Sequence, residues 1–128
     1  MTCYLDFDGT VVTFAHPAIG SPLEGVEKVI SKLQQAGWLI VLNTYRVNLN
    51  DGTFEDALNY LSGLSLSKPI TKYLKLKKMP PEWDAYHAGV MGSLYIDDVA
   101  RGIPLKNGSV DWAQVDEQLI KHGFYGKE

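Results

Sequence analysis

The sequence predicts an α/β fold built on a mainly parallel sheet, of the three-layer, doubly wound, Rossmann-like kind. Short apolar segments at 3–5, 38–42 and 94–96 are each followed at once by polar residues. Between them lie longer segments in which apolar residues recur at helical spacing. This strand–helix–strand order is typical of βαβ units, whose strands run parallel and end at one edge of the sheet.

Composition limits the classes of protein that the chain can belong to. Its 128 residues fit a single domain over 1–128, and 45% hydrophobic with 21% charged residues is ordinary for a globular protein. The net charge of −3 argues against a dedicated nucleic-acid or membrane-surface binder, although a local basic patch stays possible. With one cysteine, Cys3, in an apolar segment and no apolar run long enough for a membrane span, we expect a buried thiol and a cytoplasmic protein.

The first half of the chain predicts a flap and two helices around a central strand. Residues 11–20 begin with β-branched residues and end in Pro and Gly, which favours a short hairpin or flap. Ser21, Pro22 and Glu24 match a capping box and predict a helix start, and Gly37 predicts its end. We expect this helix to bury Val26, Val29, Ile30 and Leu33.

The second half alternates in the same way. A helix is predicted from Thr53 to Gly63, and a polar segment at 70–76 is the best candidate for an edge strand. Residues 80–92 suit a short helix or an ordered loop, and 99–108 read as loop. Asp111 is predicted to cap a last helix that buries Trp112, Val115, Leu119 and Ile120 and closes at Gly123.

Two of the predicted strands end in paired carboxylates. Asp6-Phe7-Asp8-Gly9-Thr10 follows the first strand, and the glycine allows a sharp turn whose amides can face an anion. Asp97 and Asp98 follow the strand at 93–96, where two adjacent acids repel each other unless a cation binds them. At each of the two places, the alternative to a functional site is a fortuitous acidic turn.

Other polar residues near these strand ends are weaker candidates. Thr44 ends the strand at 38–42 and has a hydroxyl that can donate to a phosphoryl oxygen, or it is a turn threonine. Arg46 either clamps phosphate or pairs with an acid on the surface. His16 either touches a substrate or is hydrogen-bonded locally. Among the lysines of 68–78, we favour Lys77 to reach back over the carboxylates, then Lys78, then Lys68, against the alternative of a solvated edge strand.

The order of these motifs resembles that of the haloacid-dehalogenase-like phosphohydrolases, whose first motif is DxDGT. The resemblance implies that Asp6 is the nucleophile, that Asp8 is the acid and base, and that Mg²⁺ binds at Asp6, Asp8, Asp97 and Asp98. It also implies phosphate or substrate binding by residues that follow the first two strands and by one lysine: Phe7, Gly9, Thr10, Thr44, Tyr45, Arg46 and Lys77. The expected activity is hydrolysis of a phosphomonoester through an aspartyl-phosphate.

The chain departs from many members of that family because its loops leave no room for a cap domain. We therefore expect an open site, covered only by the flap at 11–20 and by a second subunit if the protein is a homo-oligomer. Such a site favours a substrate that is large enough to cover the open site itself. Other functions stay open: a phosphoacceptor switch, a non-catalytic binding module, or a phosphatase that acts on nucleic-acid ends.

Overall fold

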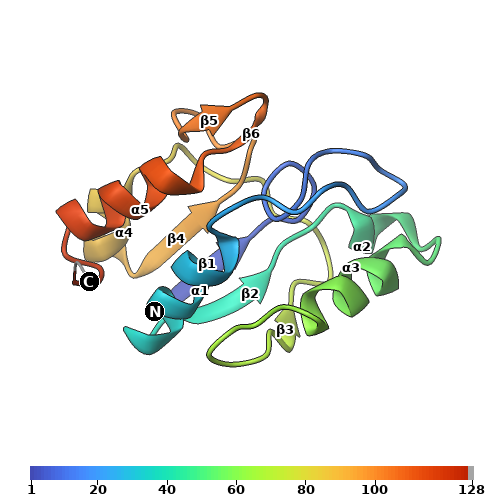
Figure 1. The fold of residues 1–128 in the computed structure, drawn as a ribbon, viewed down its shortest axis with the longest axis horizontal. Helices are drawn as coiled ribbons and strands as arrows, with labels where there is room; N and C mark the ends of the chain where they lie inside the picture. Colours follow the sequence, from blue (N-terminus) through green and yellow to red (C-terminus); the bar gives the residue numbers. More distant parts are fainter. Residues whose placement is uncertain (127–128) are drawn as a thin grey trace.

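A four-strand parallel sheet forms the centre of the protein. The computed structural model describes residues 1–126, and the strands lie in the order β3-β2-β1-β4 (Figure 1). Every neighbouring pair in this sheet is parallel, and helices flank it. The predicted α/β class with a parallel sheet is therefore confirmed. The strands are β1 (Thr2–Leu5), β2 (Leu39–Leu42), β3 (Lys72–Tyr73) and β4 (Ser93–Ile96).

The register of the three longer strands aligns their ends. Leu5 at the end of β1 pairs with Leu42 of β2 on one side and with Ile96 of β4 on the other. Backbone hydrogen bonds continue one step further, because the amide of Asp6 donates to Ile96 and the amide of Asn43 donates to Leu5. The polar residues that follow the strands therefore start at the same level of the sheet.

The core is built on one face of this sheet. Alternate residues of the central strands are fully or almost fully buried, because successive side chains of a strand point to opposite faces. The cysteine is among them, and burial raises the pKa of its thiol, as expected for a structural cysteine. On the opposite face Tyr4 and Tyr95 stack with ring centroids 4.7 Å apart. The core residues on this face of the sheet are Cys3, Leu5, Ile40, Leu42, Leu94 and Ile96.

The predicted helices are present, and one starts later than expected. The last two long helices lie where predicted, and the side chain of Asp111 caps the last one by accepting from the amide of Gln114. This helix buries Trp112, Val115 and Leu119 as expected, whereas Ile120 is only half-buried. The first begins at Val26, not at Pro22, after Gly25 in a left-handed conformation with φ 96°. A four-residue helix was not predicted. The helices are α1 (Val26–Gln35), α2 (Arg46–Leu49), α3 (Thr53–Ser62), α4 (Ala85–Met91) and α5 (Trp112–Lys121).

The late start of α1 has a tertiary cause. The residues of the matched capping box pair with the preceding segment: Thr13 donates its amide to the carbonyl of Ser21, and Leu23 donates to Val11. Residues 21–24 are thus tied to the flap, and Gly25 makes the turn into the helix. The face that α1 buries is nevertheless the predicted one, with Val26, Val29, Ile30 and Leu33.

Three loops also differ in detail from the predictions. The edge strand at 70–76 is reduced to the two residues of β3, although its place at the edge is confirmed. The loop at 99–108 contains half of a small hairpin, β5 (Leu105–Lys106) with β6 (Ser109–Val110). Asn107 and Gly108 make its turn with positive φ, the signature of a two-residue hairpin loop. Residues 11–20 form a flap without a regular strand, attached by isolated bridges at Val12.

Among residues 1–126, no helix has the length and apolar character that crossing a bilayer requires.

Candidate active site at the carboxyl ends of the strands

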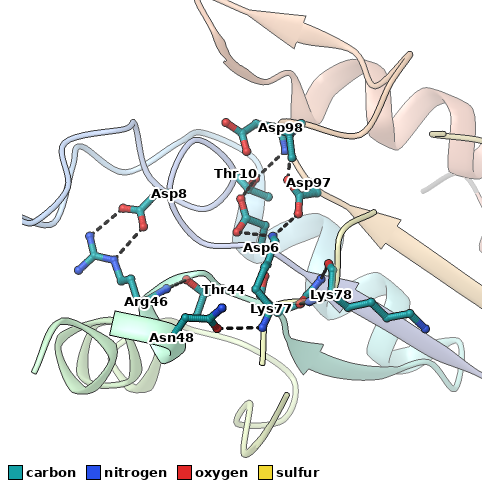
Figure 2. A network of polar contacts seen from close by, with 12 residues as sticks. Asp6, Asp8, Thr10, Thr44, Arg46, Asn48, Lys77, Lys78, Asp97 and Asp98 are labelled. Atoms are coloured by element: carbon teal, nitrogen blue, oxygen red, sulfur yellow. Dashed lines mark hydrogen bonds and ion pairs between the residues drawn. The ribbon is translucent and has the colours of Figure 1, made fainter. Parts of the chain in front are cut away.

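Three carboxylates from two strand ends lie together. One oxygen from each of Asp6, Asp97 and Asp98 lies within 4.8 Å of the other two (Figure 2). Asp6 follows β1 and the other two follow β4, so the parallel register described above brings them together. Asp6 and Asp97 are buried and Asp98 is half-buried. The predicted convergence of these acids on one edge of the sheet is confirmed.

Lys77 is the lysine that reaches this acidic cluster. Its Nζ lies 3.1 Å from Asp6 Oδ1, and it also donates to a carboxylate oxygen of Asp97. The two other candidates lie elsewhere. The ammonium group of Lys78 lies over the rings of Tyr4 and Tyr95, and the amide of Lys68 donates to Gln34. The structure therefore places Lys77, the favoured candidate, beside the carboxylates.

Two asparagines hold Lys77 in this position, and neither was among the predicted site residues. The side chain of Asn43 makes two reciprocal 2.8 Å hydrogen bonds with the backbone of Lys78. The backbone carbonyl of Asn43 accepts from Lys77 Nζ at 3.0 Å. Asn48 Oδ1 accepts from the amide of Lys77 at 3.0 Å. A polar residue directly after a buried strand was the available signal for Asn43. Nothing local distinguishes Asn48.

Thr10 and Gly9 connect the two acidic motifs. The hydroxyl of Thr10 donates to Asp6 Oδ2 and accepts from the amide of Asp98, both at 3.1 Å. Gly9 has φ +78°, and a Cβ added there would lie 2.3 Å from Asp98 Oδ2. A side chain at position 9 is therefore excluded both by the backbone conformation and by the close approach of Asp98. The expected sharp turn is present.

Asp8 does not join the other carboxylates. Its carboxylate accepts two hydrogen bonds from Arg46, at 2.7 and 2.8 Å, and Figure 2 shows it turned toward that guanidinium. The other donors of Arg46 reach the carbonyls of Pro17, Ala18 and Thr53. A guanidinium has five N–H donors, and five acceptors surround this one.

Arg46 is therefore not the surface ion pair considered from the sequence, because the residue is only 1% exposed. Nor does it have a donor left for a phosphate in this arrangement. Its contacts in this structure are structural, and the phosphate clamp expected from the sequence stays a prediction. It joins the flap, the first acidic motif and the start of α3.

The remaining predicted binding residues lie around this centre. The side chain of Phe7 is fully buried and packs edge-on against Tyr60, so only its backbone can contact a ligand. Thr44 is buried after β2, where its Oγ1 accepts from the amide of Arg46. Tyr45 is exposed and borders the cavity above the acids.

Burial and mutual repulsion dominate the electrostatics of the cluster. Burial and the charge of Asp97 raise the pKa of Asp6 well above its usual range, although Lys77 acts in the opposite direction. Burial also raises the pKa of Asp98. For Lys77, burial favours the neutral form, but the neighbouring charges and hydrogen bonds of Asp6 and Asp97 prevail and raise its pKa. One ammonium thus faces three carboxylates.

A cavity of about 400 Å³ lies above the cluster. Its polar residues are those described above, together with His16, whose buried Nε2 atom has no hydrogen-bond partner in the part of the chain that the structure describes. The cavity also has apolar residues that the sequence analysis did not single out: Phe14, Leu49, Met79 and Val99.

Comparisons with known proteins found no matching family model, no matching curated protein and no matching solved structure.

Proposed function

We propose that this protein is a Mg²⁺-dependent phosphatase that hydrolyses a phosphomonoester through an aspartyl-phosphate on Asp6. The proposal includes a doubly wound, haloacid-dehalogenase-like fold without a cap, since only the flap separates β1 from α1, and only α2 and α3 separate β2 from β3. The observation that carries it is the cluster of Asp6, Asp97 and Asp98 with Lys77 at the carboxyl edge of a parallel sheet. Ligands bind at this edge in open α/β sheets.

The donor set fits magnesium. All three side chains offer carboxylate oxygens, which are the ligands that Mg²⁺ prefers, and their number leaves positions for water and substrate phosphate. Three carboxylates face a single ammonium. Burial and the charge of Asp97 raise the pKa of Asp6, and a divalent cation would relieve the repulsion between the carboxylates. When bound, Mg²⁺ would neutralise charge on the phosphoryl oxygens and orient them.

Asp6 is the proposed nucleophile. One of its oxygens attacks phosphorus, and the bond from phosphorus to the leaving oxygen breaks. Lys77 and Thr10 hold the carboxylate of Asp6 in one orientation through their hydrogen bonds to its two oxygens. The amides of Phe7 and Asp8 have no acceptor among the described residues, which leaves them to bind a phosphoryl oxygen. The hydroxyl hydrogen of Thr44 is proposed to do the same.

Asp8 is the proposed acid and base. In the first step it gives a proton to the leaving oxygen. In the second step it takes a proton from a water molecule, which attacks phosphorus and releases phosphate from Asp6. To do this, Asp8 has to turn from Arg46 toward Asp6. The flap carbonyls that share Arg46 would keep this guanidinium in place during the movement.

A phosphoacceptor switch is the second candidate, and the pairing of Asp8 with Arg46 is the observation that favours it. An acid and base that stays with Arg46 cannot activate water beside Asp6. The aspartyl-phosphate would then persist, as a switch requires. The two functions share the first step and differ in the lifetime of the phosphorylated protein.

The test is hydrolysis of p-nitrophenyl phosphate with and without Mg²⁺, by the wild type and by Asp6→Asn and Asp8→Asn. We expect Mg²⁺-dependent turnover that each substitution reduces at least about a hundredfold, because each removes a chemical step. Glu117→Gln is the matched control, since this exposed acid lies on α5, outside the site.

Stoichiometric labelling of Asp6 by acetyl phosphate without turnover would favour the switch. Turnover that survives Asp6→Asn would contradict both candidates. If the wild type shows neither labelling nor turnover, the acidic cluster is a binding site only.

A further inference from the structure

The cavity above the acids is polar at its floor and apolar at its rim. The floor consists of the buried carboxylates and Lys77, whereas Phe14 and Met79 at the rim are 71% and 70% exposed. Tyr45, Leu49 and Val99 complete the rim. These residues come from the flap, α2 and the segments after Lys77 and Asp98. Apolar side chains from four separate segments thus surround one polar centre.

The cationic groups of the cavity are already paired. All five donors of Arg46 have protein acceptors, and Lys77 is bound by two carboxylates and one carbonyl. Among the described residues that line the cavity, no other lysine or arginine is present. A second phosphate or a carboxylate on the substrate would therefore meet no free cation and would face the acidic cluster. The rim favours a neutral group.

We propose that the substrate is a small phosphomonoester whose leaving group is neutral and apolar, of about the size of one aromatic ring. This inference rests on the proposed phosphatase function and names the substrate class of the same site. The phosphate lies on the floor, and the ring lies between Phe14, Tyr45 and Met79. Stacking on aromatic rings and burial of apolar surface then supply the binding energy.

The dimensions of the cavity agree with such a ligand. A volume of about 400 Å³ lies at the lower end of the range for small-molecule sites. A phosphate with one aromatic ring fits within this volume.

The test compares two substrates with similar intrinsic reactivity. Benzyl phosphate and glucose 6-phosphate are both esters of a primary alcohol, so a difference in kcat/KM reports the recognition of the leaving group. We expect the wild type to prefer benzyl phosphate at least about tenfold, as burial of part of a ring would give. The double variant Phe14→Ser/Met79→Ser should reduce that ratio about tenfold.

The control is Val90→Ser/Met91→Ser, which changes two similarly exposed apolar residues at the end of α4. It should keep the ratio of the wild type. Because Phe14 and Met79 are mostly exposed, their replacement should not unfold the protein, and circular dichroism checks this.

Binding measured without turnover separates this inference from the proposed function. In calorimetric titrations with Mg²⁺, benzylphosphonate should bind about tenfold more tightly than methylphosphonate, and only the rim variant should lose this difference. That preference without hydrolysis of either ester would overturn the phosphatase and support the apolar subsite. Equal binding of the two phosphonates, or equal kcat/KM for the two esters, would overturn the inference.

Discussion

Arg46 connects three segments of the chain through one buried guanidinium. It binds Asp8 in the first acidic motif, the flap carbonyls of Pro17 and Ala18, and Thr53 at the start of α3. A charge in the interior is tolerated only where it is paired and its donors are satisfied, and here every donor is. The same contacts fix where Asp8 points, so a structural residue controls access to the proposed acid and base.

We predict that Arg46→Met lowers the free energy of unfolding by about 3–5 kcal/mol, because it leaves Asp8 partly buried without its partner. The double variant Arg46→Met/Asp8→Leu should lose less, since no unpaired charge remains. Urea unfolding of the wild type, both single variants and the double variant measures the coupling.

Arg101→Met is the control, because Arg101 forms an exposed ion pair with Glu82 at 3.0 Å. Its loss should cost less than about 1 kcal/mol. Equal losses for Arg46→Met and Arg101→Met would contradict the structural role of Arg46.

The starts of α1 and α5 show which of the predicted capping residues cap a helix. Asp111 has an extended backbone and its side chain accepts from the amide of Gln114, so it caps α5 as predicted. Ser21 has an equally good local pattern, but its backbone is bonded to the flap and α1 begins five residues later. A residue caps a helix only where the chain turns into that helix. At Ser21 the hydrogen bonds to the flap keep the chain extended, so the helix does not begin there.

We predict that Asp111→Ala lowers the free energy of unfolding by about 1 kcal/mol at pH 7, whereas Ser21→Ala has almost no effect. Hydrogen bonds from Gln114 lower the pKa of Asp111 in the folded protein. A lowered pKa stabilises the fold above the unfolded value, about 3.9, and this contribution is lost as the pH falls through the folded value.

The difference between wild type and Asp111→Ala should therefore shrink below about pH 4, in urea unfolding at several pH values. A larger effect of Ser21→Ala than of Asp111→Ala would contradict the observed start of α1.

The whole molecule is organised so that one sheet edge concentrates negative charge. Parallel strands with aligned ends deliver Asp6 and Asp97 from neighbouring strands, and Lys77 returns from beyond the edge strand. Burial of these groups costs stability, as the raised pKa of Asp6 indicates. Binding of a cation should restore part of this stability, since a ligand that binds only the folded state stabilises it.

We predict that Mg²⁺ at about 100 times its dissociation constant raises the free energy of unfolding by about 2.7 kcal/mol. The corresponding rise in Tm should be several degrees, and Asp97→Asn should lose most of it. Glu117→Gln should keep it. Thermal unfolding with Mg²⁺ and with chelator tests this, and an equal rise in wild type and Asp97→Asn would contradict a metal site at these carboxylates.

The sequence by itself determined the parallel α/β fold, the helix faces and the strand ends that carry Asp6, Asp97 and Asp98. These features depend on local periodicity and on residues adjacent in the chain, which a sequence displays directly. It also indicated Lys77, since this residue ends the lysine-rich segment just before Met79-Pro80-Pro81 forces a turn.

Only the tertiary structure decided how Asp8 is oriented, how Asn43 and Asn48 hold Lys77, and which apolar residues form the rim. Asp8 and Arg46 are 38 residues apart, and their contact depends on the path of the flap and of α2. The rim combines side chains from four separate segments of the chain, which share no sequence pattern. Such contacts arise from the packing of distant segments against each other, and local periodicity does not predict them.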